Sequence, residues 1–196
     1  LVKNLSNTNH SYPTIPSEFT IVGDNLFFTA TDGSSGPTGR ALWVTDGTSN
    51  GTQMVKDIHL SIGGSNTNSV SRLFAFGDTL IFSGNDGTNG FELWKSDGTA
   101  NGTTMIKNIH PSGDGNPNYF TKLGDEVFFR GIDLNGTELW KTDGTTNGTQ
   151  LVKDINPGSS SSHCSYLTVL NGQLVFKAYS SGIELWKSDG TSNGTV

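Results

Sequence analysis

One block, of the form ELW followed by DGT, an Asn-Gly turn and a short apolar run, recurs four times in the chain. The copies are RALWVTDGTSNGTQMVKDI from Arg40, FELWKSDGTANGTTMIKNI from Phe91, TELWKTDGTTNGTQLVKDI from Thr137 and IELWKSDGTSNGTV from Ile183. Their tryptophans lie 51, 46 and 46 residues apart, at Trp43, Trp94, Trp140 and Trp186. A period of this length is typical of stacked or radial repeats. The chain is therefore expected to repeat one structural unit.

Each copy predicts a β-hairpin, because β-rich runs such as LWK and MIK flank a turn made of Asp-Gly and Asn-Gly. The turn aspartate, Asp97 in the second copy, can close an Asx-turn, and Gly98 and Gly102 tolerate positive φ. One carboxylate per turn falls short of the roughly six to eight oxygen ligands that Ca²⁺ takes. The repeated aspartates are therefore assigned to the turns, at Asp46, Asp97, Asp143 and Asp189. No metal and no cofactor is expected.

Each unit contains four predicted strands, which in the third unit cover 117–124, 126–132, 137–143 and 149–155. Four strands in a unit of this length are what a β-propeller blade requires. We predict an all-β, four-bladed β-propeller with four antiparallel strands per blade, forming a single domain over residues 1–196. The blades are expected at about 16–58, 69–109, 117–155 and 164–196, the last together with residues 1–5.

The amino-terminal run LVKNL, residues 1–5, matches the closing strands MVKDI, MIKNI and LVKDI of the first three units. The fourth hairpin reaches Val196 where such a strand is needed. We therefore expect residues 1–5 to complete the last blade, which would remove exposed sheet edges.

The repeated glutamates and lysines predict a cross-strand charge ladder. In the hairpin register that we expect, the glutamate before each LW faces the lysine of the closing strand. The pairs are Glu92 with Lys107, Glu138 with Lys153 and, across the closure, Glu184 with Lys3. Each half-exposed pair would contribute about 0.2–1 kcal/mol.

The composition supports a turn-rich all-β protein with a neutral polar surface. Only 32% of the residues are hydrophobic and 15% charged, and 26 are glycine. The formal charge of −6, without any Lys/Arg cluster, gives no reason to bind nucleic acid. No apolar run approaches the roughly 18 residues of a membrane span, so membrane insertion is not expected. The single cysteine, Cys164, is expected to be a small core residue.

The block ELWKSDGT, followed by two residues, GT and a VKDI-like strand, resembles the ELWxxDGT repeat family of secreted and surface proteins in bacteria. The resemblance covers all four units. It implies a secreted, β-propeller-like repeat protein with an extracellular location, and it brings no particular chemistry. The first unit departs from the pattern, with Ala41 in place of Glu and Val44 in place of Lys.

The chain has no G-x-S-x-G elbow, P-loop or CxxC motif, so we do not expect an enzyme. We predict a non-enzymatic, extracellular and multivalent carbohydrate-binding propeller, that is, a lectin-like protein. Sugars bind through planar polar groups and an aromatic platform, and several weak sites together gain avidity. Aromatic side chains are available at Tyr12, Tyr119, Tyr166, Tyr179 and Phe91.

The expected ligand-binding residues lie in the loops between second and third strands and in the links between units. They are Asp86, Asn89, Asp133 and Asn135 from the loops, with His59 and His110 from the links. The expected partners are glycans or a surface protein, and a homo-oligomer is compatible with the sequence. The alternative function is that of a structural or adhesive propeller that binds another protein.

Overall fold

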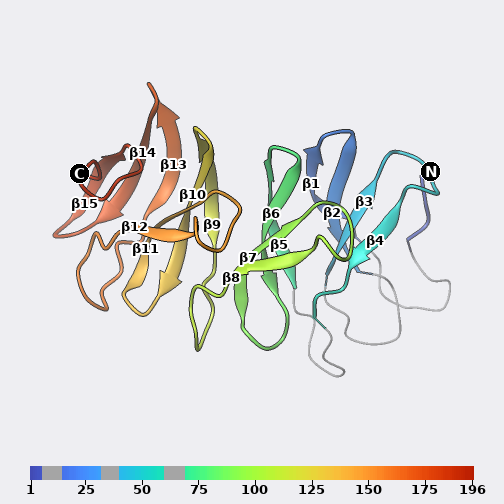
Figure 1. Ribbon diagram of the computed structural model, residues 1–196, viewed down its shortest axis with the longest axis horizontal. Coiled ribbons are helices and arrows are strands. Elements are labelled where there is room, and N and C mark those ends of the chain that lie inside the picture. Colours follow the sequence, from blue (N-terminus) through green and yellow to red (C-terminus); the bar gives the residue numbers. More distant parts are fainter. Residues whose placement is uncertain (6–14, 32–39, 60–68) are drawn as a thin grey trace. The chain divides into compact units, whose positions relative to one another are not determined.

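The computed structural model describes residues 1–5, 15–31, 40–59 and 69–196. Within these ranges the chain contains fifteen strands and no helix, and the strands form four antiparallel sheets (Figure 1). The all-β prediction is confirmed. The chain divides into two compact units, Leu1–Met105 and Ile106–Val196. The single domain over 1–196 stays a prediction.

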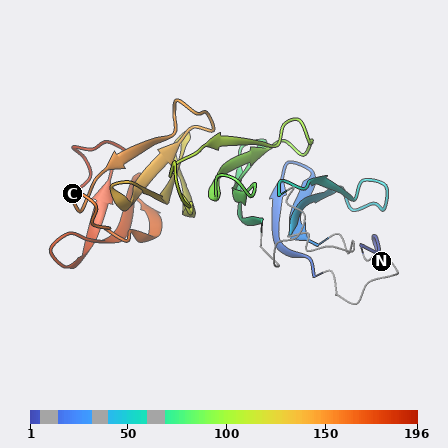
Figure 2. The same cartoon turned by 90° about the horizontal axis from the view of Figure 1, so that it is seen from below.

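The first unit holds two sheets in which neighbouring strands follow the order of the sequence, as in a meander (Figures 1 and 2). Val55 and Ile58, at the end of the first sheet, share one apolar cluster with Trp94 of the second. A Cβ at Gly84 would come within 2.8 Å of both Ile58 Cδ1 and Trp94 Cδ1. Trp94 therefore packs between the two sheets of this unit. The strands are β1 (Ser17–Val22), β2 (Asn25–Ala30), β3 (Ala41–Thr45), β4 (Gln53–Lys56), β5 (Val70–Phe76), β6 (Thr79–Asn85), β7 (Phe91–Ser96) and β8 (Thr104–Lys107), the last of which crosses the boundary between the units.

The second unit repeats this plan with one strand fewer. Its core contains Phe128, Leu139 and Val152 from one sheet and Leu174 and Phe176 from the other. Cys164 belongs to the same core, and its complete burial raises the pKa of the thiol to about 12, so the thiol stays protonated at neutral pH. The strands are β9 (Asn118–Leu123), β10 (Glu126–Asp133), β11 (Gly136–Thr142), β12 (Gln150–Lys153), β13 (Ser165–Leu170), β14 (Gln173–Tyr179) and β15 (Ile183–Ser188).

The predicted completion of the last blade by residues 1–5 is not seen in the described sheets and stays a prediction, because residues 1–5 and the fourth sheet belong to different units. Residues 1–5 contain no strand, and the sheet β13-β14-β15 has three strands. Lys3 is instead held by the first hairpin, because its Nζ donates to the carbonyl oxygens of Ser49 (3.2 Å) and Thr52 (2.6 Å). The structure thus shows four antiparallel sheets without showing a closed ring.

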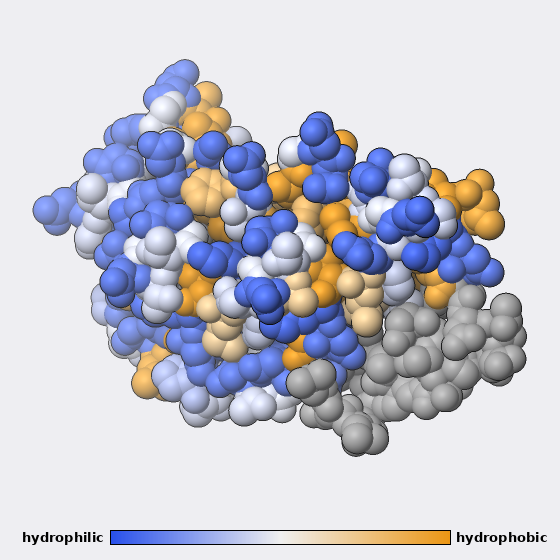
Figure 3. All heavy atoms as spheres, turned by 45° about the vertical axis from the view of Figure 1, so that its right-hand side comes forward, coloured by the Kyte–Doolittle hydropathy of each residue, from blue (hydrophilic) through white to orange (hydrophobic). Residues whose placement is uncertain are grey.

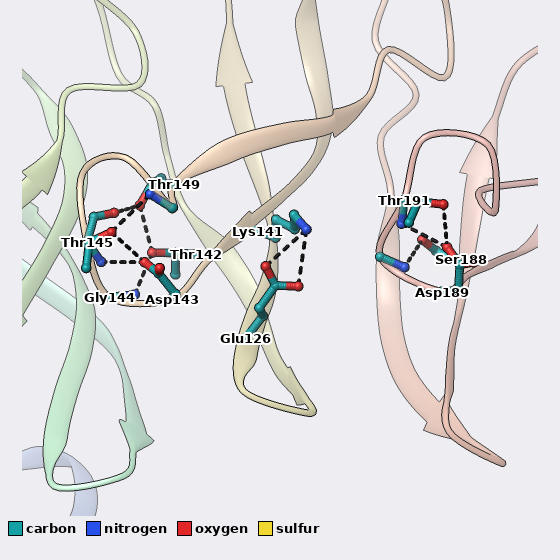
Figure 4. A network of polar contacts seen from close by, with 12 residues as sticks. Glu126, Lys141, Thr142, Asp143, Gly144, Thr145, Thr149, Ser188, Asp189 and Thr191 are labelled. Carbon is teal, nitrogen blue, oxygen red and sulfur yellow. Dashed lines mark hydrogen bonds and ion pairs between the residues drawn. The ribbon is translucent and has the colours of Figure 1, made fainter.

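The DGT turns have the same geometry in all four hairpins. In the third, Asp143 Oδ1 accepts hydrogen bonds from the backbone N–H (2.8 Å) and the hydroxyl (2.7 Å) of Thr145 (Figure 4). Thr145 Oγ1 in turn accepts the N–H of Gly148, and a Cβ at Gly148 would collide with the Asp143 carboxylate. The buried hydroxyls of Thr142 and Thr149 are 2.7 Å apart and join the two strands. The assignment of the aspartates to Asx-turns is confirmed.

One pair of the predicted glutamate–lysine ladder, Glu138 with Lys153, is wrong, and the other two stay predictions. A bulge between Leu139 and Trp140 places Lys153 opposite Leu139 rather than opposite Glu138. Lys153 Nζ donates to the carbonyl oxygen of Thr195, at 2.7 Å, in the next hairpin. Lys56 and Lys107 make the same contact with Thr103 and Thr149. These lysines therefore connect successive hairpins.

Candidate functional site

The first strand of every sheet carries a β-bulge with a non-glycine residue at positive φ. The residues are Glu18 (54°), Arg72 (58°), Tyr119 (58°) and Tyr166 (58°), and the strand register shifts at each of these places. A non-glycine residue in the left-handed region is strained and persists where the surrounding structure enforces it. Bulges also re-aim side chains. Each repeat therefore holds one side chain at the same bulge position, and the residue at that position differs between repeats.

In the second unit this position brings two tyrosines together. The rings of Tyr119 and Tyr166 have centroids 6.2 Å apart and planes inclined by 46°. Strands β9 and β13 are tied together nearby, because Thr121 Oγ1 donates to the carbonyl oxygen of Leu167 at 3.1 Å. Tyr119 is half-buried, whereas Tyr166 is 72% exposed. The pair is an aromatic surface open to solvent.

Two cationic side chains flank the tyrosines. Arg130 Cζ lies 4.9 Å from the centroid of the Tyr119 ring, and Lys177 Nζ lies 5.6 Å from that of Tyr166. Both come from the second strand of their sheets, at register positions opposite Asn118 and Ser165. Arg130 Nε is buried and has no hydrogen-bond acceptor among the described residues. We call Tyr119, Tyr166, Arg130 and Lys177 the tyrosine platform.

The first unit lacks an aromatic counterpart to this platform. Its two bulge positions are Glu18 and Arg72, and the second-strand positions are Thr29 and Ser83. Glu18 Oε2 accepts the backbone N–H of Leu73 at 3.2 Å, so this carboxylate is engaged within the unit. The repeated sequence therefore does not repeat the platform, and multivalent ligand binding stays a prediction.

Asp86 and Asn89, two of the predicted site residues, contact each other in the turn between β6 and β7. Asp86 Oδ1 accepts the backbone N–H groups of Thr88 (2.9 Å) and Asn89 (2.8 Å), and Oδ2 accepts the Asn89 amide at 2.7 Å. Partial burial works to raise the pKa of Asp86, but the hydrogen bonds outweigh it and the pKa is lowered. This carboxylate is therefore ionised at neutral pH, and the hydrogen bonds described here lie within its own turn.

Asp133 and Asn135 form a similar turn between β10 and β11, with Asp133 accepting the backbone N–H (2.8 Å) and the amide (3.0 Å) of Asn135. The histidines lie in the links that come after β4 and β8. The N–H of His59 donates to Asp57 Oδ1 at 3.1 Å, and the carbonyl oxygen of His110 accepts the N–H of Gly113 at 3.2 Å. Local structure thus accounts for the observed contacts of these residues, and their role in ligand binding stays a prediction.

The sequence did contain a signal for the platform. Tyr119 and Tyr166 occupy the same position in neighbouring repeats, three residues after Asn116 and His163, which also have positive φ. Their pairing with Arg130 and Lys177 depends on the bulge, which shifts the register and was not predicted. Tyr12, another aromatic residue considered for sugar binding, lies outside the described residues.

The remaining surface features concern the polarity of the surface and the residues that could bind a metal ion. Hydrophilic side chains dominate the face drawn in Figure 3, interrupted by smaller apolar patches. Over the ranges that the structure describes, no three His, Cys, Asp or Glu side chains gather closely enough to hold a metal ion. Within the same ranges no helix is long and apolar enough to cross a membrane.

No family model and no curated protein sequence matches the chain. Solved structures do resemble it. Puromycin hydrolase is similar at 17% identity and a TM-score of 0.57, over 98% of this chain and 30% of that one. An acylaminoacyl peptidase from Pyrococcus horikoshii is similar at 10% identity and a TM-score of 0.54, over 89% of this chain and 26% of that one. A prolyl endopeptidase is similar at 11% identity and a TM-score of 0.57, over 93% of this chain and 26% of that one.

The chain thus spans less than a third of the length of each of these three structures. At such low identity the likeness concerns the fold alone, and the activities of those proteins do not carry over. Together with the four sequential sheets, it identifies this chain as an all-β protein of β-propeller-like fold.

Proposed function

We propose that this chain is a non-enzymatic binding module for carbohydrates and that the tyrosine platform is its sugar-binding surface. The observation that carries the proposal is the exposed Tyr166 ring, held beside Tyr119 by a bulge and flanked by two cations. The resemblance to secreted ELWxxDGT repeat proteins supports an extracellular location, where glycans are available as ligands.

The platform matches the chemistry of a sugar on two counts. A pyranose presents an apolar C–H face that packs on an aromatic ring and hydroxyl groups that need hydrogen-bond partners. The tyrosine rings supply the apolar surface, and their phenol groups and the two cations supply donors. Because bulged backbones hold the rings in place, little conformational freedom is lost on binding.

The cations further favour acidic sugars. A carboxylate on the ligand would be attracted to the Arg130 guanidinium and to the Lys177 ammonium beside the two rings. Charge-assisted hydrogen bonds of this kind are roughly twice as strong as neutral ones. Binding of a uronic or sialic acid should therefore weaken as the salt concentration rises.

The test is binding of the purified chain to a glycan array, followed by calorimetry with the best ligand. Tyr166→Ala should weaken binding about tenfold, the equivalent of one good aromatic contact. Tyr179→Ala is the matched control, because Tyr179 is also a partly exposed tyrosine of this unit (41%) and lies on β14 outside the platform. Equal effects of the two substitutions, or an array without any bound glycan, would count against the proposal.

A second candidate is an adhesive or structural module that binds another protein. One observation favours it: β15 presents apolar side chains to solvent, with Ile183 71% and Leu185 80% exposed. Such an edge is suited to strand addition rather than to sugar binding. Glycan binding that survives substitutions on β15 would separate the two functions.

A further inference from the structure

Seven asparagines of the chain are followed directly by glycine. In such an Asn-Gly pair the backbone nitrogen of the glycine can attack Cγ of the asparagine side chain, because glycine has no Cβ to hinder the approach. The attack requires that the glycine N–H loses its proton and that the asparagine side chain turns toward the nitrogen. The surroundings of each pair therefore decide whether it reacts. The asparagines are Asn50, Asn89, Asn101, Asn135, Asn147, Asn171 and Asn193.

Four of these pairs lie in the DGT loops, where the glycine N–H is already engaged. In the third loop the N–H of Gly148 donates to Thr145 Oγ1 at 3.0 Å, and the other three loops repeat this bond at 2.9 Å. A Cβ at Gly148 would lie 2.0 Å from Asp143 Oδ1, so a carboxylate also packs against this glycine. The hydrogen bond holds the proton on the nitrogen, and the nearby carboxylate disfavours the anion that the attack requires. The loops therefore slow the reaction at Asn50, Asn101, Asn147 and Asn193.

Two further pairs lie in turns between second and third strands, where an aspartate holds the asparagine amide. Asn89 Nδ2 donates to Asp86 Oδ2 at 2.7 Å, and Asn135 Nδ2 donates to Asp133 Oδ2 at 3.0 Å. These bonds fix the side chains whose Cγ would have to turn toward the glycine nitrogen. The reaction is therefore slowed in these turns as well.

The pair Asn171–Gly172 has neither kind of protection. It forms the two-residue turn between β13 and β14, closed by the pairing of Leu170 with Gln173. Both residues are exposed, and a Cβ at Gly172 would meet no atom within 4 Å. Within the described ranges, neither the Asn171 amide nor the Gly172 N–H has a hydrogen-bond partner. The glycine nitrogen and the asparagine side chain are thus both open to solvent.

The same turn has another sequence in the other three sheets. There the first and second strands are joined by glycine followed by aspartate, which contains no amide side chain to attack. The fourth sheet therefore carries the reactive pair at a position where its repeats do not. The equivalent turns are Gly23-Asp24, Gly77-Asp78 and Gly124-Asp125.

We propose that Asn171 is a site of spontaneous deamidation in the folded protein and that the DGT loops protect their own asparagines from this reaction. The Gly172 nitrogen gives its proton to a base in the solvent and attacks Asn171 Cγ, the bond between Cγ and Nδ2 breaks, and the amide leaves as ammonia. Water then opens the cyclic imide at either carbonyl, which leaves aspartate or isoaspartate. The product carries an additional negative charge, and isoaspartate adds a backbone carbon to the turn that fixes the register of β13 and β14.

This reaction involves none of the platform residues, so the inference stands or falls independently of sugar binding. The purified full chain is kept at mildly alkaline pH, and every Asn-Gly pair is followed by peptide mapping, mass spectrometry and an enzymatic assay for isoaspartate. Asn171 should react first. Asn147 should react more slowly by at least about fivefold, because the Gly148 hydrogen bond must open beforehand. In concentrated urea, where the loops are unfolded, the two asparagines should react at similar rates.

The substitution Thr145→Val tests the protection directly. It removes the acceptor of the Gly148 N–H and should accelerate the reaction at Asn147 by about five- to tenfold. Asn193 lies in the unchanged fourth loop and should keep its rate, which shows in the same sample that the fold is intact.

The matched control in the same loop is Thr146→Ala. The second repeat has Ala100 at this position and keeps the hydrogen bond of its loop glycine, so the alanine is compatible with the loop. Thr146→Ala leaves the Gly148 bond to Thr145 in place and should therefore leave the rate at Asn147 unchanged.

Three results would overturn the proposal. The first is a folded chain in which Asn171 reacts no faster than Asn147. The second is a difference between these two asparagines that persists in urea, because it would then come from the local sequence and not from the fold. The third is a rate at Asn147 that Thr145→Val leaves unchanged or that Thr146→Ala raises equally.

Discussion

The third and fourth sheets contain almost the same hairpin in two different surroundings. TELWKTDG in β11 and IELWKSDG in β15 differ at two positions, yet Leu139 is fully buried and Leu185 is 80% exposed. The DGT turns of the two hairpins are alike, with Asp143 and Asp189 each accepting two hydrogen bonds from the threonine two residues later (Figure 4). The turn is thus a local property of the sequence, whereas burial of the strand depends on a neighbouring strand.

The largest expected difference in unfolding free energy is that between substitutions of the two motif leucines, Leu139 and Leu185. Leu139→Ala should cost about 2–5 kcal/mol of unfolding free energy, because it leaves a cavity in the core of the second unit. Leu185→Ala should change it by about 0.5 kcal/mol or less, because this leucine is exposed. Urea unfolding of both variants at low protein concentration measures the difference. Similar losses at the two sites would mean that β15 is covered in solution.

The second largest difference in stability is expected between substitutions of the two motif glutamates, Glu138 and Glu184. Glu138→Ala removes the acceptor of the Ile155 N–H, and a buried donor left without a partner costs about 1–3 kcal/mol. The N–H of Ser162 loses the same carboxylate but keeps the carbonyl oxygen of Thr137, at 3.0 Å. Burial raises the pKa of Glu138 against the opposing effect of these hydrogen bonds, so part of the loss is offset by removing a buried charge.

Glu184→Ala is the matched control for that substitution, since this glutamate is exposed and the expected change is within about 0.5 kcal/mol. Thermal unfolding at neutral pH compares the two variants. A larger effect at Glu184 than at Glu138 would contradict the comparison.

The smallest effect on stability is expected in the DGT turns, where the third and fourth sheets should behave alike. Hydrogen bonds from the threonine side chain and backbone lower the pKa of Asp46, Asp97 and Asp189. The stability that they contribute is fully present above the ordinary aspartate pKa of about 3.9 and is lost as the pH falls through the lowered values. Thermal unfolding between neutral pH and strongly acidic pH should show the melting temperature falling in that acidic window.

The substitutions Thr145→Val and Thr191→Val test whether the turns are equivalent. Each removes one hydroxyl that donates to the aspartate and accepts a glycine N–H, so each should lower the melting temperature by a few degrees. Thr191→Val should also reduce the sensitivity to acid. Unequal shifts would show that the difference between the sheets extends beyond the edge of β15.

Much of the local structure could be predicted from the sequence because it depends on short-range interactions. The hairpins, the Asx-turns and the four strands of the first three sheets follow from Asp-Gly and Asn-Gly turns between β-rich runs. The candidate site could not be predicted in the same way. Tyr119 and Tyr166 meet only because each first strand bulges, and a bulge results from how two strands pair rather than from either strand alone.

The sequence by itself determined the repeat, the strand order within each sheet and the turn chemistry, since these require contacts only between residues close along the chain. Register and burial were decided by the tertiary structure. The bulge after Leu139 moved Lys153 away from Glu138, and the lack of a fourth strand beside β15 left Leu185 in solvent. The physical reason is that cross-strand partners and neighbouring sheets lie far apart in sequence, so that a nearly identical motif becomes core in one place and surface in another.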